Sequence, residues 1–223
     1  MTRNFSFGGQ LFQIAGDAAL YWPEKRALLV ADLHLEKASA YATGGQMLPP
    51  YDSLSTLEEL ARLAEAHSAQ AIICLGDNFH DDEGERRLGG GAAGLLRHLT
   101  QAFAWTWITG NHDRNLAARW GGDAVPEIAT AGIILRHEAD PTDPTPEISG
   151  HFHPKYRAVM RKRMVSRRCF VQTGNKIIMP AFGALTGGMD AGDKVIRSAC
   201  GLLASDPMAA LVPINGGLTR FAI

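Results

Sequence analysis

The sequence has few cysteines, little net charge and no long apolar run, and each absence narrows the class of protein. Its three cysteines, Cys74, Cys169 and Cys200, are odd in number and have no C-x-x-C spacing, which argues against a disulfide framework and a cysteine-bound zinc site. No apolar run approaches the roughly 18–20 residues that a membrane-spanning helix needs. Residues 1–10 do not have the pattern of a secretory signal. We therefore expect a soluble, cytoplasmic protein that does not bind membranes.

The formal net charge of −1 hides a strong asymmetry. Residues 1–147 hold 11 Lys/Arg and 20 Asp/Glu, a net charge of −9, whereas residues 148–189 hold 8 Lys/Arg and no acidic residue, a net charge of +8. A basic block therefore lies in the second half of a chain that has no basic excess overall. With 223 residues and 46% hydrophobic content, the chain can bury one sizeable core, and we expect a single domain over residues 1–223.

The first half of the chain alternates predicted strands with predicted helices. Continuous apolar runs, typical of strands buried on both faces, predict strands over residues 27–31, 71–75 and 103–108. Apolar residues at helical spacing predict helices over 52–67 and 92–99. The second half shows short strands separated by turns, over residues 133–135, 170–173, 177–180, 210–214 and 218–223. This order indicates an α/β protein with a second sheet that we expect to be more antiparallel.

Four short polar motifs follow one another along the chain, and three of them come directly after an apolar run. They are D-L-H at 32–34, G-D-N at 76–78, G-N-H-D at 110–113 and G-H-F-H at 150–153. In open α/β sheets, ligand sites lie beyond the carboxyl ends of the strands. Any one of these motifs is commonly a hydrogen-bonded turn, but four in this order favour one shared site.

The side chains of these motifs suit a pair of divalent metal ions. Two metals about 3.5–4 Å apart can activate a water as hydroxide and neutralise a phosphate during in-line displacement. The candidate ligands are Asp32, His34, Asp77, Asn111, His151 and His153. Asp77 stands alone at a strand end and is the natural carboxylate for both ions to share. This mixture of oxygen and nitrogen ligands suits Mn, Fe or Zn and does not choose among them. Of the three, we expect Mn first.

The order of the motifs resembles that of the calcineurin-like metallophosphoesterase superfamily. The pattern of that family is D-x-H, G-D, G-N-H-D/E, a lone histidine and G-H-x-H, and this chain matches it over residues 27–154. The resemblance implies a four-layer α/β/β/α sandwich of two mixed sheets. It also implies a metal-dependent phosphoesterase that acts through a metal-bridging hydroxide.

The resemblance further implies a role for each residue of the motifs. The first metal would be held by Asp32, His34, Asp77 and His153, and the second by Asp77, Asn111, His137 and His151. His112 would bind no metal but would protonate or stabilise the leaving oxygen. Asp113 would orient the imidazole of His112. The sequence around His137 marks it least of all these residues, because no distinctive motif surrounds it.

Further segments resemble a subfamily, the bacterial ligase-associated metallophosphoesterases. They are A-D-L-H-L-E-K at 31–37, L-P-P-Y-D at 48–52, G-D-N-F-H-D at 76–81 and P-A-F-G at 180–183. This resemblance implies a phosphodiesterase with a role in DNA repair and a functional association with a DNA ligase and a helicase.

The basic block directly follows the last motif. Seven of its members crowd into 14 residues: Lys155, Arg157, Arg161, Lys162, Arg163, Arg167 and Arg168. A basic strip beside a metal centre can follow a nucleic-acid backbone or clamp a phosphate. The alternative is a solvated edge hairpin, on which Lys and Arg discourage strand-to-strand aggregation.

Two rival functions stay open alongside the diesterase. One is a phosphomonoesterase or nucleotide pyrophosphohydrolase on the same scaffold. The other is a non-catalytic interaction scaffold, which would be expected to have lost ligands or the histidine at position 112. Both are present here, so the sequence favours an enzyme acting on a phosphodiester substrate.

Overall fold

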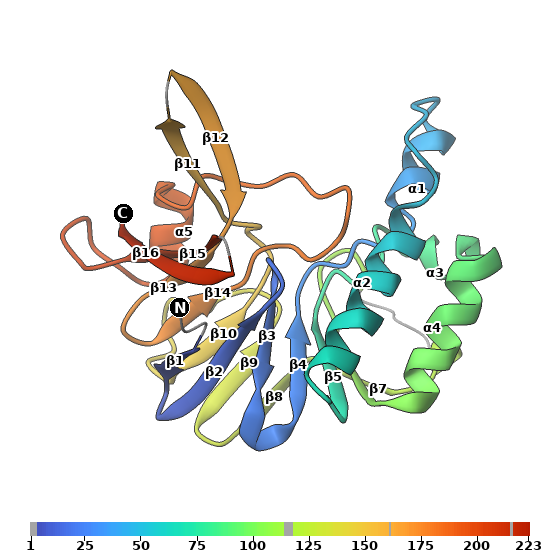
Figure 1. Ribbon diagram of the computed structural model, residues 1–223, viewed down its shortest axis with the longest axis horizontal. Coiled ribbons are helices and arrows are strands. Elements are labelled where there is room, and N and C mark those ends of the chain that lie inside the picture. The colour runs from blue at the N-terminus through green and yellow to red at the C-terminus, as the bar shows by residue number, and fades with distance from the viewer. Residues whose placement is uncertain (1–3, 114–117, 161, 215) are drawn as a thin grey trace.

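The computed structural model describes residues 4–113, 118–160, 162–214 and 216–223. In this part of the chain, two seven-stranded sheets pack face to face, helices cover their outer faces, and a two-stranded hairpin projects from the body (Figure 1). The expected α/β sandwich of two mixed sheets is confirmed.

The first sheet has its strands in chain order, from β1 to β7. They are β1 (Asn4–Phe7), β2 (Gln10–Ala15), β3 (Ala19–Trp22), β4 (Ala27–Val30), β5 (Ala71–Leu75), β6 (Ala104–Ile108) and β7 (Asp123–Val125). Neighbouring strands are antiparallel from β1 to β4 and parallel from β4 to β7. The three predicted apolar strands are therefore the parallel centre of the sheet, and their carboxyl ends lie at one edge.

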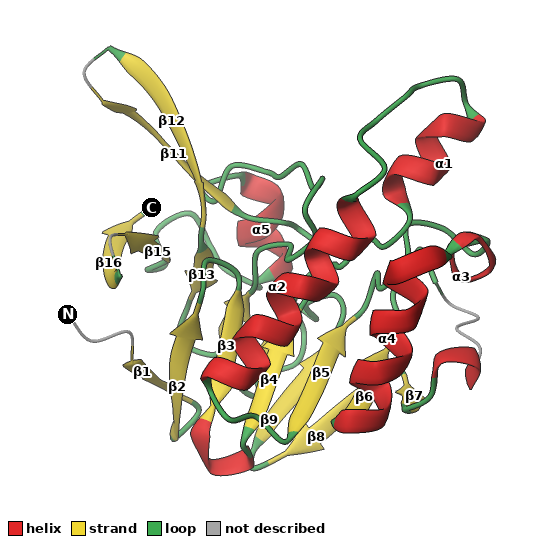
Figure 2. Cartoon of the chain, turned by 45° about the vertical axis from the view of Figure 1, so that its right-hand side comes forward, coloured by secondary structure: helices red, strands yellow, loops and turns green. Residues whose placement is uncertain are grey.

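Two long helices cover the outer face of this sheet (Figure 2). They are α2 (Asp52–Ala66) and α4 (Gly90–Ala102), so both predicted helices are confirmed, the second with an additional turn. Leu57 and Leu60 of α2 pack with Leu96 of α4 into the core cluster on that face. The short helices α1 (Lys37–Thr43) and α3 (Gly84–Arg87) and the 3₁₀ turns at Pro23–Lys25 and Ala118–Trp120 were not predicted.

The second sheet has the order β16-β15-β13-β14-β10-β9-β8. Its strands are β8 (Glu127–Thr130), β9 (Ile133–Arg136), β10 (Glu147–Ser149), β13 (Phe170–Gln172), β14 (Lys176–Ile178), β15 (Ala209–Ile214) and β16 (Gly217–Ala222). The helix α5 (Lys194–Ala199) packs through Ile196 on the outer face. This sheet is more antiparallel than the first, as expected, because only the pairs of β10 with β9 and with β14 are parallel. The crossover between β9 and β10 contains no helix, so it left no helical pattern in the sequence.

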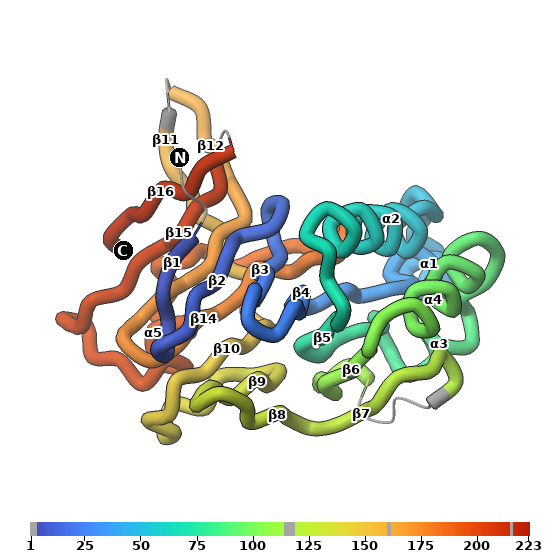
Figure 3. The backbone as a smooth tube through the Cα atoms, turned by 60° about the horizontal axis from the view of Figure 1, so that its bottom comes forward, coloured from blue at the N-terminus to red at the C-terminus, as the bar shows by residue number. Residues whose placement is uncertain are grey.

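The main core lies between the two sheets. It joins Phe12 and Leu29 of the first sheet to Leu135, Ile148 and Ile177 of the second. Figure 3 shows β1 to β4 running alongside β9, β10 and β14. This packing brings the loops after β9 and β10 to the edge at which β4, β5 and β6 end.

The basic block forms the projecting hairpin, made of β11 (Lys155–Met160) and β12 (Arg163–Arg168) (Figures 1 and 2). Its register pairs Lys155 with Arg168, Arg157 with Ser166 and Val159 with Met164. Directly opposed residues of an antiparallel pair lie on the same face. We call this face the site-side face, since it contacts the loop beside the metal centre described below.

Candidate metal centre

The four motifs meet where β4, β5, β6 and β10 end, and their backbone is unusual there. Five candidate ligands have a positive φ, between 45° and 71°. They are Asp32, His34, Asp77, His151 and His153. Non-glycine residues rarely adopt this conformation, which costs about 1–3 kcal/mol at each position and is concentrated at functional sites. The tertiary structure therefore holds these side chains in place at a local energetic cost.

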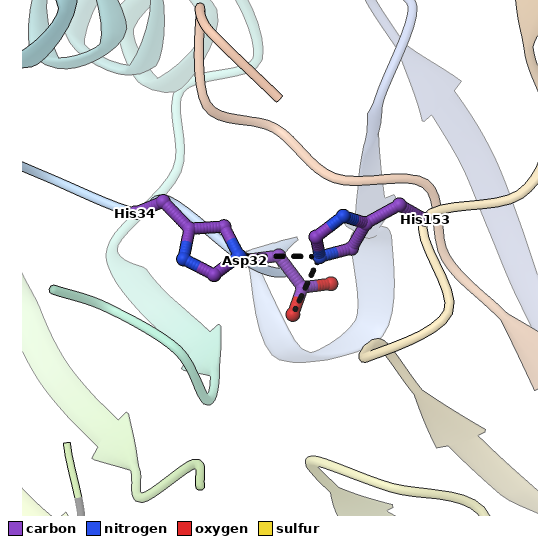
Figure 4. A group of neighbouring side chains, drawn as sticks. All are labelled: Asp32, His34 and His153. Atoms are coloured by element: carbon purple, nitrogen blue, oxygen red, sulfur yellow. Dashed lines mark hydrogen bonds and ion pairs between the residues drawn. The ribbon is translucent and has the colours of Figure 1, made fainter. Parts of the chain in front are cut away.

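The first group of candidate ligands consists of Asp32, His34 and His153, whose side chains converge (Figure 4). Asp32 and His34 are buried, and the His153 side chain is 18% exposed. The Nε2 atoms of the two histidines are 3.2 Å apart, and His153 Nε2 lies 3.5 Å from Asp32 Oδ1. Donor atoms about 2.1 Å from one ion at tetrahedral or octahedral angles are about 3.0–3.4 Å apart. The spacing therefore fits a single ion between the three side chains.

The second group consists of Asp77, His137 and His151. His137 Nε2 lies 3.1 Å from His151 Nδ1 and 3.3 Å from Asp77 Oδ1. It is also 2.9 Å from Asn111 Oδ1, which adds a neutral oxygen donor. The structure thus brings His137, the residue that the sequence marked least, into the middle of this group.

Asp77 lies between the two groups. Its Oδ1 faces His137, whereas its Oδ2 lies 3.9 Å from His34 Nε2. One carboxylate therefore presents one oxygen to each candidate site, as a shared ligand requires. Gly110 makes room for it, because an added Cβ there would lie 2.2 Å from both the backbone nitrogen and Oδ1 of Asp77.

Burial favours the neutral imidazole at two of the candidate ligands, His34 and His151. Burial, with a contribution from His153, lowers the pKa of His34 from 6.5 to about 2, so its imidazole is uncharged at neutral pH. Burial, with a contribution from His137, likewise lowers the pKa of His151. His137 Nδ1 lies 3.1 Å from the Leu75 carbonyl, to which it donates when Nε2 is the metal-facing atom. Neutral imidazoles and a shared carboxylate are a donor set that fits divalent transition metals.

His112 lies at the open side of the centre. Its backbone N–H donates to Asp77 Oδ1 at 3.0 Å, and its side chain is 41% exposed. Its Nδ1 lies 2.7 Å from the His80 carbonyl, so Nδ1 donates and Nε2 is the free ring nitrogen, 3.9 Å from Asp77 Oδ2. The His80 ring stacks beside it, with centroids 5.6 Å apart.

The structure corrects the role expected for Asp113. Its Oδ2 accepts hydrogen bonds from the backbone N–H and the side-chain amide of Asn78, both at 2.8 Å, and its Oδ1 accepts from the Gly110 N–H at 2.9 Å. The His80 carbonyl occupies the position at His112 Nδ1 that we expected Asp113 to take. Asp113 is buried and instead joins the loops that follow β5 and β6. Burial raises the pKa of its carboxyl, while these hydrogen bonds oppose the shift.

Alternation of side chains along the hairpin divides the basic block. On the site-side face, Arg168 Nη2 donates to the Gly183 carbonyl at 2.6 Å, Lys155 Nζ to the Thr186 carbonyl at 3.3 Å and Arg157 Nη2 to the Gly188 carbonyl at 3.2 Å. Lys162, Arg163 and Arg167 are exposed. Arg161 lies outside the described residues. The sequence showed the cluster of cations, but only the structure shows which of them already donate hydrogen bonds to carbonyl groups of the protein.

The fold and the site together define a metal-dependent phosphoesterase. A family model described as calcineurin-like phosphoesterase matches residues 25–162, which is more than half of the chain. The chain therefore belongs to the calcineurin-like phosphoesterase family, as its motifs indicated.

Solved structures agree with this assignment. The chain is similar to the nuclease MPE of Pseudomonas putida, with 27% identity, a TM-score of 0.74, and coverage of 99% of this chain and 100% of that one. It is more distantly similar to Yfce, a phosphoesterase from E. coli, with 16% identity, a TM-score of 0.44, and coverage of 88% and 98%. That second likeness is too distant to bear on function. No curated protein matches the chain by sequence.

Two negative expectations can be compared with the structure. The three cysteines are buried, and no disulfide joins them in the structure. Within the described residues, no helix is both long enough and apolar enough to cross a bilayer.

Proposed function

We propose that the protein is a dinuclear-metal phosphodiesterase. The observation that carries this proposal is the position of Asp77, which offers one oxygen to each of two compact ligand groups. The ligands of the first ion would be Asp32, His34, Asp77 and His153, and those of the second would be Asp77, Asn111, His137 and His151. Manganese is the ion that we would test first, with iron and zinc as alternatives.

The side chain of His112 supplies the acid of the proposed reaction. Two bound ions would provide an activated water and neutralise the phosphate charge. The His80 carbonyl holds one proton on Nδ1, so Nε2 points toward the open centre. In the doubly protonated ring, Nε2 would deliver its proton to the leaving oxygen, and the ring would stay neutral with its remaining proton on Nδ1. The 41% exposure of the side chain leaves space for a substrate beside it. His112 is thus a catalytic residue, and His80 is its positioning residue.

We further propose that the diester belongs to nucleic acid. The support is the similarity to a nuclease over nearly the whole chain and the exposed cations in the described part of the projecting hairpin. Lys162, Arg163 and Arg167 would contact the phosphates of DNA. We assign the other three cations mainly to contacts within the protein, because each donates to a backbone carbonyl; they are Lys155, Arg157 and Arg168. Membership of the ligase-associated subfamily, a role in DNA repair, and association with a ligase and a helicase extend this proposal.

The test compares two small substrates with added manganese. We expect hydrolysis of bis-(p-nitrophenyl) phosphate to exceed that of p-nitrophenyl phosphate. Replacing His112 by Ala should lower kcat on the diester by about 10²–10⁴-fold, since it removes the general acid. A clear preference for the monoester would replace the diesterase by the rival phosphomonoesterase. Wild-type protein that binds two metal ions but hydrolyses neither substrate would favour the interaction scaffold.

A further inference from the structure

The base of the basic hairpin is joined to the metal centre by residues 180–188, which we call the 180–188 loop. On the metal side, the Phe182 N–H donates to the Ala31 carbonyl at 2.8 Å, and the Gly183 N–H donates to the Asp32 carbonyl at 3.2 Å. The contact is tight, since an added Cβ at Gly183 would lie 2.2 Å from the Leu33 carbonyl oxygen. The loop therefore lies directly on the segment that carries the Asp32 ligand.

Arg168 holds the same loop from the hairpin side. Its Nη2 donates to the Gly183 carbonyl at 2.6 Å and lies 3.4 Å from Thr186 Oγ1. The Thr186 hydroxyl donates to the same Gly183 carbonyl at 2.8 Å. Gly183 is thus held at its carbonyl by the hairpin and at its amide by the backbone of Asp32. The partly buried guanidinium of Arg168 contacts the loop through Nη2.

The other contacts of Asp32 come from a different direction. Its N–H donates to the Gly76 carbonyl at 3.2 Å, and its carboxylate accepts from the His151 N–H at 2.9 Å. These bonds arise from the loops after β5 and β10. The 180–188 loop contacts Asp32 from another side, through the hydrogen bond from the Gly183 N–H to the Asp32 carbonyl. If this loop moves away, the backbone of Asp32 can leave its positive-φ conformation.

We propose that Arg168 is a positioning residue for the first metal site, acting through Gly183 on the backbone of Asp32. A member of the basic block thus fixes a ligand and does not contact the substrate. The inference relies on the proposed function only in that Asp32, His34 and His153 bind a metal ion. Both acceptors of the 180–188 loop are reached by one nitrogen of Arg168, Nη2.

The experiment measures manganese binding by calorimetry without substrate. The reference is a His151→Ala protein, which keeps the first ligand group and loses part of the second. In that background, Arg168→Met should weaken manganese binding by about tenfold, as the loss of an outer contact to a ligand typically does. Arg168→Lys should restore part of the affinity. In a His34→Ala background, where the second group remains, Arg168→Met should change the affinity less than twofold.

Thr186→Val is the milder variant for the case that Arg168→Met fails to fold, since it removes only the hydroxyl that also holds the Gly183 carbonyl. It should weaken the first site in the same direction. Arg26→Met is the matched control, because Arg26 donates to the Ser68 carbonyl at 3.2 Å on an exposed surface remote from the centre. With otherwise wild-type ligands, bis-(p-nitrophenyl) phosphate turnover by Arg168→Met should recover at saturating manganese.

Several results would overturn the proposal. Unchanged affinity of the first site in folded Arg168 and Thr186 variants would do so, as would equal weakening of both sites together with a lower melting temperature. Wild-type protein that binds no manganese would also refute it. By contrast, a protein that binds two ions and shows the selective weakening but cleaves no diester would refute only the proposed function.

Discussion

The stability of the metal-free protein should depend on pH through His34. This side chain is 5% exposed, and its pKa falls from 6.5 to about 2 on folding, first because of burial and then because of His153. Between these two values the unfolded chain binds a proton that the folded chain does not. The contribution of His34 to the free energy of unfolding is therefore fully present above pH 6.5 and is lost as the pH falls below that value.

The size of the loss follows from the distance to pH 5. The 1.5 pH units between 6.5 and 5, at 1.36 kcal/mol each, correspond to about 2 kcal/mol of unfolding free energy. In a domain of about 150–250 residues, such a change shifts the melting temperature by about 4–8 °C.

The assay is denaturant unfolding of chelator-treated protein at pH 8, 7, 6 and 5. A His34→Gln variant has no titratable group at this position, so its loss of stability between pH 8 and 5 should be smaller than that of wild type by about 2 kcal/mol. His98→Gln is the control, since His98 is exposed on α4 and its replacement should leave the pH profile unchanged. Identical profiles for wild type and His34→Gln would refute the reasoning.

Three further outcomes are expected. Asp77→Asn should reduce manganese stoichiometry from two ions to at most one in calorimetry, because the carboxylate faces both ligand groups; two ions bound with unchanged affinity would contradict the shared-ligand assignment. Gly110→Ala should destabilise the protein and weaken metal binding, since its Cβ would lie 2.2 Å from Asp77. Gly94→Ala is the matched control, because a Cβ there meets nothing within 4 Å, and it should stabilise α4 by up to about 1 kcal/mol in thermal unfolding. Charge reversal of Arg163 and Arg167 should slow cleavage of DNA at low salt but spare bis-(p-nitrophenyl) phosphate, and equal losses on both substrates would argue that the hairpin supports the centre instead of the polymer.

Much of the fold could be predicted because the strongest signals were local. The apolar run over residues 71–75 coincides with β5, and the helical spacing after position 52 coincides with α2. The parallel pairing of β9 with β10 could not be predicted, because it depends on a long crossover loop and on contacts with the first sheet. Short elements such as α1 and α5 also gave no clear periodicity, since they span only 7 and 6 residues.

The candidate site divides in the same way. Asp32, His34, Asp77, His151 and His153 could be proposed from their motifs. No motif surrounds His137, so its assignment as a candidate ligand depended on the family resemblance. It reaches the other candidate ligands because the packing of the two sheets places the end of β9 beside the end of β5. Asp113 shows the opposite case, since its position beside His112 in sequence suggested a contact that the folded loops direct elsewhere.

The sequence by itself determined the set of candidate ligands, the strands that precede them and the family, because these depend on residue type, order and spacing. The tertiary structure alone decided which oxygen of Asp77 faces which ligand group, which partner fixes His112, and which cations of the basic hairpin are already bonded to the protein. The physical reason is that a hydrogen bond or a shared ligand requires atoms within about 3 Å of one another. Here, residues more than 100 positions apart, such as Asp32 and His151, reach that distance only after the two sheets have packed.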